Sequence, residues 1–87
     1  MSNFDLTVIT PEGVIYDEKI DMVIVPGKEG GLGILSHHIP LISALKKGEI
    51  RIKKEEKRKK IEIEKGFMKV DKDGVEILIQ TTVNSQQ

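Results

Sequence analysis

The side chains best able to do chemistry lie in one short segment, Ser36-His37-His38. A histidine pair can ligate a metal ion, and a serine beside a histidine can act as nucleophile and base. Adjacent residues of an extended chain point to opposite faces, however, so the two histidines cannot easily ligate one ion. A catalytic zinc needs about three protein ligands, and with no cysteine in the chain only carboxylates remain. The sequence neighbours Ser36 and His37 also do not by their adjacency adopt the geometry of a catalytic triad. We therefore expect no catalytic and no metal site here, and a structural or interface role for the histidines.

The remaining charged residues also predict no catalytic machinery. Most acids lie in alternating segments or at turns, where solvated charge is the usual interpretation. The run Lys53–Lys60 carries six bases and two acids, and it is typical of an exposed hairpin tip whose charges protect a sheet edge. No aromatic side chain is interleaved with it for stacking on bases, so we expect no nucleic-acid partner. Nothing in these patterns predicts an enzyme.

A glycine-rich stretch, Val25–Pro40, is the segment around which the rest of the chain is arranged. It holds four of the eight glycines, two of the three prolines and both histidines. Four glycines between Gly27 and Gly33 predict a shaped loop that presents Lys28 and Glu29 at its tip, because glycine alone readily adopts φ > 0. The alternative is a tight connection between strands. The stretch lacks the GxxxxGK[ST] spacing, and no helix pattern follows it, so we expect no phosphate or other cofactor to bind there.

Length and composition predict one small β-rich domain. The chain has 87 residues, no cysteine, twenty isoleucines and valines, and three aromatics. Residues branched at Cβ pack well on a pleated surface, so this composition favours strands. The net charge is zero, but residues 1–30 carry six acids and two bases, whereas residues 31–87 carry eight acids and twelve bases. This asymmetry favours docking between charged surfaces. No apolar run approaches the ~18 residues of a membrane span and no signal segment begins the chain, so we expect a soluble, intracellular protein.

Apolar residues alternate with polar ones along most of the chain, which is the period of a half-buried strand. The expected strands cover residues 4–9, 14–16, 20–25, 41–45, 49–53, 60–64, 67–70 and 75–83. The spacing in 41–45 also fits one helical turn, but the segment is too short for a stable helix, so a strand is preferred. Turns are expected at 10–13, 54–59 and 71–74, with a bend or bulge at Lys65-Gly66 and a flexible tail at 84–87. Eight to ten short strands in one domain, residues 1–87, predict an all-β fold, an antiparallel sandwich or barrel.

Several segments together resemble a known family. They are Val-Pro-Gly-Lys-Glu-Gly-Gly-Leu-Gly-Ile-Leu-Ser-His-His-Ile-Pro-Leu (25–41), Leu-Lys-Lys-Gly-Glu-Ile-Arg-Ile (45–52), Phe-Asp-Leu-Thr-Val-Ile-Thr-Pro-Glu-Gly (4–13) and Glu-Lys-Gly-Phe-Met-Lys-Val (64–70). With these segments the chain resembles the N-terminal β-sandwich domain of the epsilon subunit of bacterial F-type ATP synthase. The resemblance implies a flattened antiparallel β-sandwich of about ten short strands in two five-stranded sheets.

The resemblance also implies a function and partners. The family's domain is a non-catalytic rotor part of the central stalk, which joins the gamma subunit to the c-subunit ring and meets the F1 alpha/beta assembly only through the complex. It lies at the cytoplasmic face of the bacterial membrane as a peripheral component, associated with the membrane only through that complex. Gamma contacts are implied at Thr10, His38 and Ser43. Contacts to the c ring are implied at Lys28, Glu29, Gly30 and Gly31.

Two departures from the family pattern bear on these expectations. Many relatives have an acidic residue where this chain has Gly31, so Glu29 or Lys28 is expected to take over any salt bridge to the ring. Typical epsilon subunits continue into a helical hairpin that restrains ATP hydrolysis, whereas this sequence stops at Gln87, which implies little or no such inhibition. Two other functions remain open at this stage: a free-standing β-sandwich that binds a small ligand, and a small metal-dependent hydrolase, which the ligand count disfavours.

Overall fold

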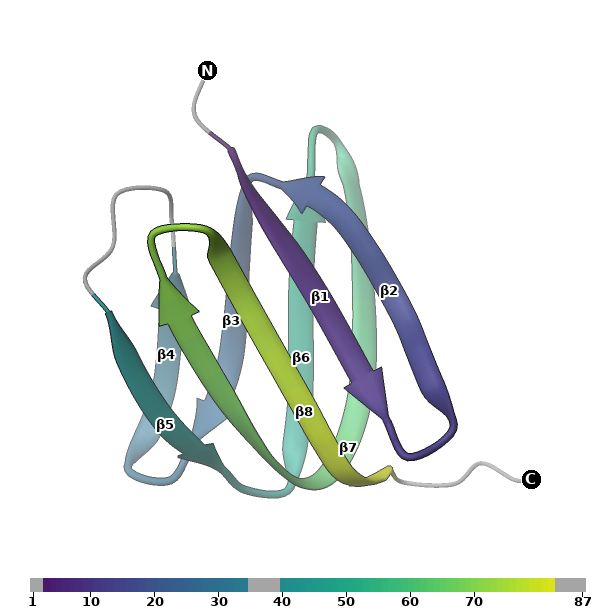
Figure 1. Cartoon of the computed structure of the whole chain (residues 1–87), viewed down its shortest axis with the longest axis vertical. Helices are drawn as coiled ribbons and strands as arrows, with labels where there is room; N and C mark the ends of the chain where they lie inside the picture. The colour runs from purple at the N-terminus through teal and green to yellow at the C-terminus, as the bar shows by residue number, and fades with distance from the viewer. Residues whose placement is uncertain (1–2, 35–39, 83–87) are drawn as a thin grey trace.

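The computed structural model describes residues 3–34 and 40–82 of the chain, and every element in this part is a β-strand (Figure 1). The strands are β1 (Phe4–Thr10), β2 (Gly13–Ile20), β3 (Met22–Gly27), β4 (Gly30–Ile34), β5 (Leu41–Leu45), β6 (Gly48–Lys54), β7 (Lys57–Asp71) and β8 (Gly74–Thr82). The expected all-β class is confirmed.

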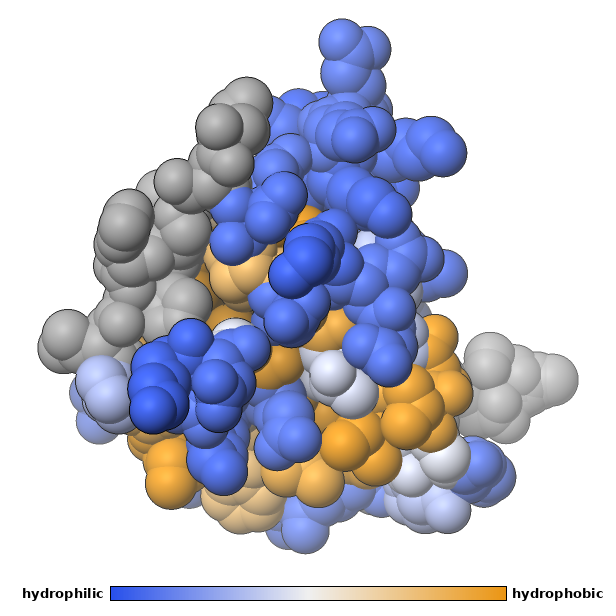
Figure 2. All heavy atoms as spheres, turned by 45° about the horizontal axis from the view of Figure 1, so that its top comes forward, coloured by the Kyte–Doolittle hydropathy of each residue, from blue (hydrophilic) through white to orange (hydrophobic). Residues whose placement is uncertain are grey.

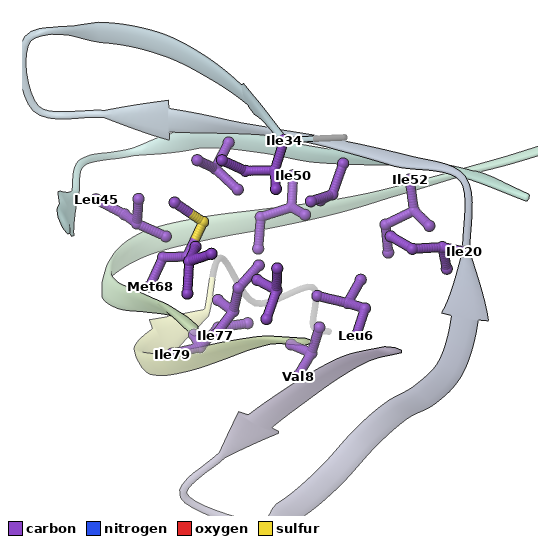
Figure 3. Close-up of a cluster of buried hydrophobic side chains, with 14 of the residues drawn as sticks. Leu6, Val8, Ile20, Ile34, Leu45, Ile50, Ile52, Met68, Ile77 and Ile79 are labelled. Atoms are coloured by element: carbon purple, nitrogen blue, oxygen red, sulfur yellow. The ribbon is translucent and has the colours of Figure 1, made fainter. Parts of the chain in front are cut away.

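The strands form two layers that face each other (Figures 1 and 3). The front layer contains β2, β1, β8, the second half of β7, and β5 in that order, and the rear layer contains β4, β3, β6 and the first half of β7. The two layers are joined through β7, which pairs with β6 over its first seven residues and with β5 and β8 over its last ones. A second junction is the single pair Gly27–Leu45 between β3 and β5.

A core of apolar side chains, nearly all aliphatic, fills the space between the layers (Figure 3). In β1, the inward residues Phe4, Leu6 and Val8 are buried, as the alternation predicted. The same holds in β6 for Ile50 and Ile52. The core members are Phe4, Leu6, Val8, Ile20, Val23, Val25, Ile34, Leu45, Ile50, Ile52, Ile63, Met68, Val70, Val75, Ile77 and Ile79. Close packing of so many branched side chains makes the sandwich stiff.

The bend predicted at Lys65-Gly66 is confirmed as a β-bulge in β7. The pairing with β8 shifts register between Ile63 and Lys65 and again between Lys65 and Gly66. A Cβ at Gly66 would lie 2.6 Å from the carbonyl oxygen of Leu78, so the backbones approach too closely there for any side chain. The bulge lets one strand leave the rear layer and enter the front layer.

Two sequence-based expectations about the sheets need correction. The described residues form eight strands and not about ten. Residues 57–71 make one bent strand where two were expected, at 60–64 and 67–70, and Gly30–Ile34 makes a strand that the pattern did not predict. The sheet is also mixed: β1 and β8 pair in parallel, with Leu6 opposite Val75 and Val8 opposite Ile77. These two strands come from opposite ends of the sequence, so no hairpin turn dictates their relative direction.

The segment 20–25, expected as one strand, is divided at Asp21 between β2 and β3. Ile20 is buried before the break and Val23 after it, so the inward positions change parity across Asp21. The backbone amide of Asp21 donates to the Lys53 carbonyl oxygen at 2.9 Å, and its carboxylate accepts from the amide of Glu55 at 2.7 Å. These bonds fix the point where the chain passes from the front layer to the rear layer.

Candidate partner-binding surfaces

The glycine-rich stretch forms a β-hairpin with a two-residue turn, so the alternative interpretation of a tight connection between strands is the one observed. Gly27 and Gly30 face each other at the ends of β3 and β4, and Lys28 and Glu29 form the exposed turn. Among the four glycines of the hairpin only Gly30 has a left-handed φ, 133°. Gly33 has an ordinary φ, and a Cβ placed on it would have no neighbour nearer than 3.9 Å, so its conformation does not require glycine.

Backbone hydrogen bonds hold this hairpin tip against β5. The Lys28 amide donates to the Ala44 carbonyl oxygen at 3.1 Å, and the Lys46 amide donates to the Pro26 carbonyl oxygen at 2.9 Å. A Cβ at Gly27 would lie 2.7 Å from the Gly30 carbonyl oxygen, so the turn is also closely packed on itself. The two charges at the tip are therefore presented from a fixed base.

The same packing creates a shallow hollow of about 370 Å³ between the hairpin tip and β5. Its lining includes Lys28, Glu29, Gly30 and Gly31, the residues expected to contact the c ring, together with Ser43, which was expected to contact gamma. Residues far apart in sequence thus share one surface. Ile42 also lines the hollow and is 75% exposed, and it was not singled out from the sequence.

The other two residues expected at a gamma contact lie elsewhere or outside the described residues. Thr10 is only 8% exposed, at the end of β1. Its hydroxyl donates to the Gly13 carbonyl oxygen at 3.0 Å and accepts from the Glu12 amide at 3.1 Å, so it stabilises the β1–β2 turn. Ser43 is half-buried opposite Met68, and its hydroxyl donates to the Ala44 carbonyl oxygen at 3.3 Å. His38, like His37, belongs to residues 35–39, which the structure does not describe.

A row of apolar side chains crosses the outer face of the front layer, and the sequence pattern did not reveal it. Its five members lie directly opposite one another on successive strands: Ala44 (β5), Phe67 (β7), Leu78 (β8), Ile9 (β1) and Val14 (β2). Three of them are large and exposed: Val14 is 58% exposed, and Phe67 and Leu78 are 43% exposed each. Figure 2 shows apolar side chains gathered in a band across the lower part of this face. We call these five residues the apolar row.

The available signal for the apolar row was the loss of strict alternation. Leu78 lies between the buried residues Ile77 and Ile79, so three apolar residues follow one another in β8. Such a run indicates a strand whose two faces both meet apolar surroundings. Joining Leu78 with Phe67 and Val14, however, requires the pairing of strands that are distant in sequence.

Beside the apolar row the outer face is charged. Lys19 forms an ion pair with Asp5 at 3.2 Å and Lys69 forms one with Asp71 at 3.9 Å, both exposed to solvent. A hollow of about 530 Å³ here is lined by Asp5, Asp17, Asp71, Asp73 and Glu76 among others. Within residues 3–34 and 40–82, no group of three or more histidine, cysteine or acidic side chains is arranged to hold a metal ion. In the same residues no helix is long and apolar enough to cross a bilayer.

At the edge of the front layer formed by β2, side chains of β2 make polar contacts with the rear layer. Lys54 donates a hydrogen bond to the Glu18 carboxylate, and this bond with the Lys54 charge holds the pKa of Glu18 below its ordinary value. The same hydrogen bond raises the pKa of Lys54. Burial, assisted by the Glu18 charge, raises the pKa of the Tyr16 hydroxyl. The Lys59 ammonium lies 5.9 Å from the centroid of the Tyr16 ring, at the range of a cation–π contact.

Comparison with known proteins defines the class. The family model described as "ATP synthase, Delta/Epsilon chain, beta-sandwich domain" matches residues 3–85. The two-layered fold agrees with that description, and the chain belongs to this family.

Individual relatives point to the epsilon chain. The chain is 40% identical over 82 residues to the ATP synthase epsilon chain of Desulforamulus reducens, which covers 94% of this chain and 62% of the relative. It is 38% identical over 87 residues to that of Bacillus licheniformis, which covers 100% of this chain and 66% of the relative. The chain thus spans about three fifths to two thirds of the length of these relatives.

Solved structures support the fold. A chain of the mitochondrial ATP synthase of Euglena gracilis, solved with OSCP, F1 and the c ring, superposes with a TM-score of 0.87 at 23% identity, covering 95% of this chain and 54% of that one. A chain from the central stalk and c ring of the Tetrahymena thermophila mitochondrial ATP synthase gives a TM-score of 0.76 at 16% identity, covering 91% of this chain and 64% of that one. At these identities the likeness shows the fold alone.

Proposed function

We propose that this chain is a non-catalytic rotor subunit of the central stalk of an F-type ATP synthase, which joins the gamma subunit to the c ring. In this role it supports the coupling of ion translocation to ATP synthesis, while other subunits carry out catalysis. The family match over residues 3–85 supports the proposal at the level of the complex. The observation that carries the more specific claim is the apolar row on the outer face of the front layer.

The apolar row is the proposed binding surface for the gamma subunit. Exposed apolar side chains that gather in one patch mark interaction surfaces more often than isolated ones do. This row begins at Ala44, the neighbour of Ser43, and reaches Ile9, the neighbour of Thr10. The resemblance assigned gamma contacts to Ser43 and Thr10, and both have their hydroxyls engaged within the chain. We therefore assign the binding energy to the apolar side chains between them.

The tip of the β3–β4 hairpin is the proposed contact to the c ring. Lys28 and Glu29 are exposed there, and Gly30 and Gly31 leave the adjacent surface free of side chains. The hollow beside β5 is large enough to accept side chains of a partner loop. Glu29 or Lys28 takes the place of the acidic residue that many relatives have at position 31. Backbone hydrogen bonds hold the turn against β5, so the hairpin can transmit force to a partner without bending.

The proposed mechanism is mechanical. The described residues, 3–34 and 40–82, act as one stiff unit between the shaft and the ring, and the apolar core resists shear because its side chains interdigitate at close packing. The β7 strand passes through both layers, so a torque applied to the front layer is transmitted covalently to the rear layer. The protein uses no cofactor in this role. It meets the F1 alpha/beta assembly and the cytoplasmic face of the bacterial membrane through the complex, as a peripheral component.

We further propose that these 87 residues by themselves give little or no inhibition of ATP hydrolysis. In the family that activity is assigned to a helical hairpin, and all elements in the described residues are strands.

Co-purification tests the assignment to the complex. The tagged 87-residue chain is expressed in a bacterial strain whose own epsilon subunit is deleted, and the membrane ATPase is solubilised in mild detergent. We expect the tag to recover gamma and the c ring together with the chain. Recovery of the chain alone would instead favour the free-standing ligand-binding sandwich.

A further inference from the structure

Four cations form a patch on the outer face of the rear layer, away from the apolar row and from the hairpin tip. Ile50 and Ile52 of β6 point into the core, so Arg51 and Lys53 between them point outward. Opposite them on β7 stand Lys60 and Arg58, in the pairs Arg51–Lys60 and Lys53–Arg58. We call these four residues the cationic ribbon.

The ribbon places like charges directly opposite each other in two successive cross-strand pairs. Such pairs destabilise a sheet, so a chain selected only for stability would not keep them. Arg51 forms an ion pair with Glu49 at 3.3 Å. Within the described part of the chain, Lys53, Arg58 and Lys60 form no ion pair. The next pair on this face, Glu49–Glu62, places carboxylates at one end of the ribbon only. An anionic partner would supply counter-charges to the cations at the other end, Lys53 and Arg58.

Beside the ribbon lies an apolar strip. Met22 and Ile24 of β3 are half-buried and pair with Lys53 and Arg51. These side chains and the ribbon line a hollow of about 280 Å³, and none of the described residues that line it carries a carboxylate. Next to Ile24, Gly33 of β4 contributes no side chain, which leaves the strip open on that side. The surface thus combines cations with a smooth apolar margin.

We propose that this face binds an acidic, extended segment of a partner protein. Arg51 and Lys53 are two residues apart on one strand, so their side chains emerge about 6.8 Å apart. Carboxylates on alternate residues of an extended segment share one face at the same spacing, and each can meet one cation of the ribbon. The residues between them reach the apolar strip or solvent. This binding surface is separate from the proposed contacts to gamma and the c ring and does not depend on them.

Two other anionic partners fit the face less well. A membrane surface would require exposed apolar anchors near the cations. Among the described residues, the large exposed apolar side chains belong to front-layer parts of β2, β5, β7 and β8: Val14, Ile15, Ile42, Phe67 and Leu78. A single-stranded nucleic acid would require aromatic side chains for stacking. The two exposed or half-buried aromatics of the described residues, Tyr16 and Phe67, are not on this face.

Binding of a labelled peptide to the 87-residue chain tests the proposal. The probe is a short peptide with glutamate at alternate positions and threonine between them, followed by fluorescence anisotropy at low ionic strength. A second peptide of the same composition has its glutamates in adjacent pairs, which divides the charges between both faces. We expect tighter binding of the alternating peptide and amide NMR shifts confined to β3, β6 and β7.

Matched variants separate the ribbon from net charge. Lys53→Gln with Arg58→Gln should weaken the alternating peptide about tenfold or more, since two charge contacts are lost. Lys47→Gln with Lys72→Gln removes the same charge from two exposed sites elsewhere and should weaken binding less than about twofold. The ribbon variant should be at least as heat-stable as the parent, because a like-charge pair is removed.

Three results would overturn the proposal. The first is absence of binding by the alternating peptide. The second is an equal loss of affinity in both double variants, which would reduce the effect to net charge. The third is tighter binding of phosphatidylglycerol vesicles or of a single-stranded oligonucleotide than of the peptide, with the same dependence on Lys53 and Arg58.

Discussion

Phe67 and Leu78 lie directly opposite each other on β7 and β8, and both point away from the core. Each is 43% exposed, whereas their chain neighbours Met68 and Ile77 are fully buried. This part of the front layer therefore has apolar side chains on both faces, although the described residues cover only the inner one. A second layer of protein on the outer face would complete its burial, and we assign that role to gamma.

Replacing Phe67 and Leu78 together by serine should therefore weaken binding to gamma strongly while changing the stability of the free chain little. Removal of half-exposed side chains from a surface costs little in the free chain, but loss of an apolar anchor in an interface weakens binding by about 2 kcal/mol or more. We expect at least a tenfold rise in the Kd for purified gamma in calorimetry, with a nearly unchanged urea midpoint.

The control for this variant is Lys65→Ser with Lys72→Ser, two exposed sites outside the apolar row. It should bind gamma as the parent does. Equal binding by the Phe67/Leu78 variant and the parent would remove the apolar row from the gamma interface.

Valine substitutions at two glycines of β4, Gly30 and Gly33, should differ sharply in their effect on stability. Gly30 has φ 133°, which side chains rarely adopt, so Gly30→Val should destabilise the fold by roughly 1–3 kcal/mol and distort the turn. Gly33 has no such strain and only a contact at 3.9 Å, so Gly33→Val should change stability by less than about 0.5 kcal/mol. Urea unfolding of both variants measures the difference, and equal destabilisation would be inconsistent with the hairpin geometry.

Alanine at Gly66 should be among the most damaging small substitutions in the chain. Its Cβ would lie 2.6 Å from the Leu78 carbonyl oxygen and 3.3 Å from the Cα of Ile79, so the bulge must open to admit it. We expect a loss of about 2 kcal/mol or more, by analogy with other cases of forced overpacking. Gly31→Ala, with no neighbour nearer than 3.9 Å, is the matched control. A Gly66→Ala variant as stable as this control would contradict the described bulge.

The Glu18–Lys54 pair should respond to pH at both ends of the range. The folded pKa of Glu18 is lowered, so its contribution to stability is present above the unfolded value of 4.5 and is lost as the pH falls through the lower folded pKa. The folded pKa of Lys54 is raised, so its contribution is present below 10.5 and is lost as the pH rises through the higher folded pKa. NMR titration of the Glu18 carboxyl carbon should give a pKa below 4.5. In Lys54→Met it should move back towards that value, and no movement would exclude Lys54 as the cause.

Local sequence patterns predicted most strands and turns, because these depend on neighbouring residues. The exception is β4 (Gly30–Ile34), which lies in the stretch expected as a loop. The alternation around Leu6 and Ile50, the turn at Asp71–Gly74 and the bulge before Phe67 all follow from period two and from glycine placement. The parallel pairing of Leu6 with Val75 did not follow, because it depends on how distant segments pack after the hairpins have formed.

The candidate surfaces were predicted in part for the same reason. Lys28 and Glu29 were expected at an exposed tip, and the structure places them there. That Ser43 lines the same hollow depends on the hydrogen bond from Lys28 to Ala44, a contact between distant segments. The apolar row requires the register of five strands at once, and the resemblance named only the neighbours of its members, Thr10 and Ser43.

Reconstitution into membranes tests the proposed coupling role of the chain. Bacterial membranes whose ATP synthase lacks its epsilon subunit are supplied with the purified 87-residue chain, and ATP-driven ion pumping is followed with a fluorescent probe alongside the rate of ATP hydrolysis. We expect pumping per ATP hydrolysed to be restored by the parent chain and by Lys65→Ser with Lys72→Ser, but not by Phe67→Ser with Leu78→Ser at the same concentration. Hydrolysis that continues without any gain in pumping, at a concentration where the parent chain is bound to the complex, would contradict a coupling role.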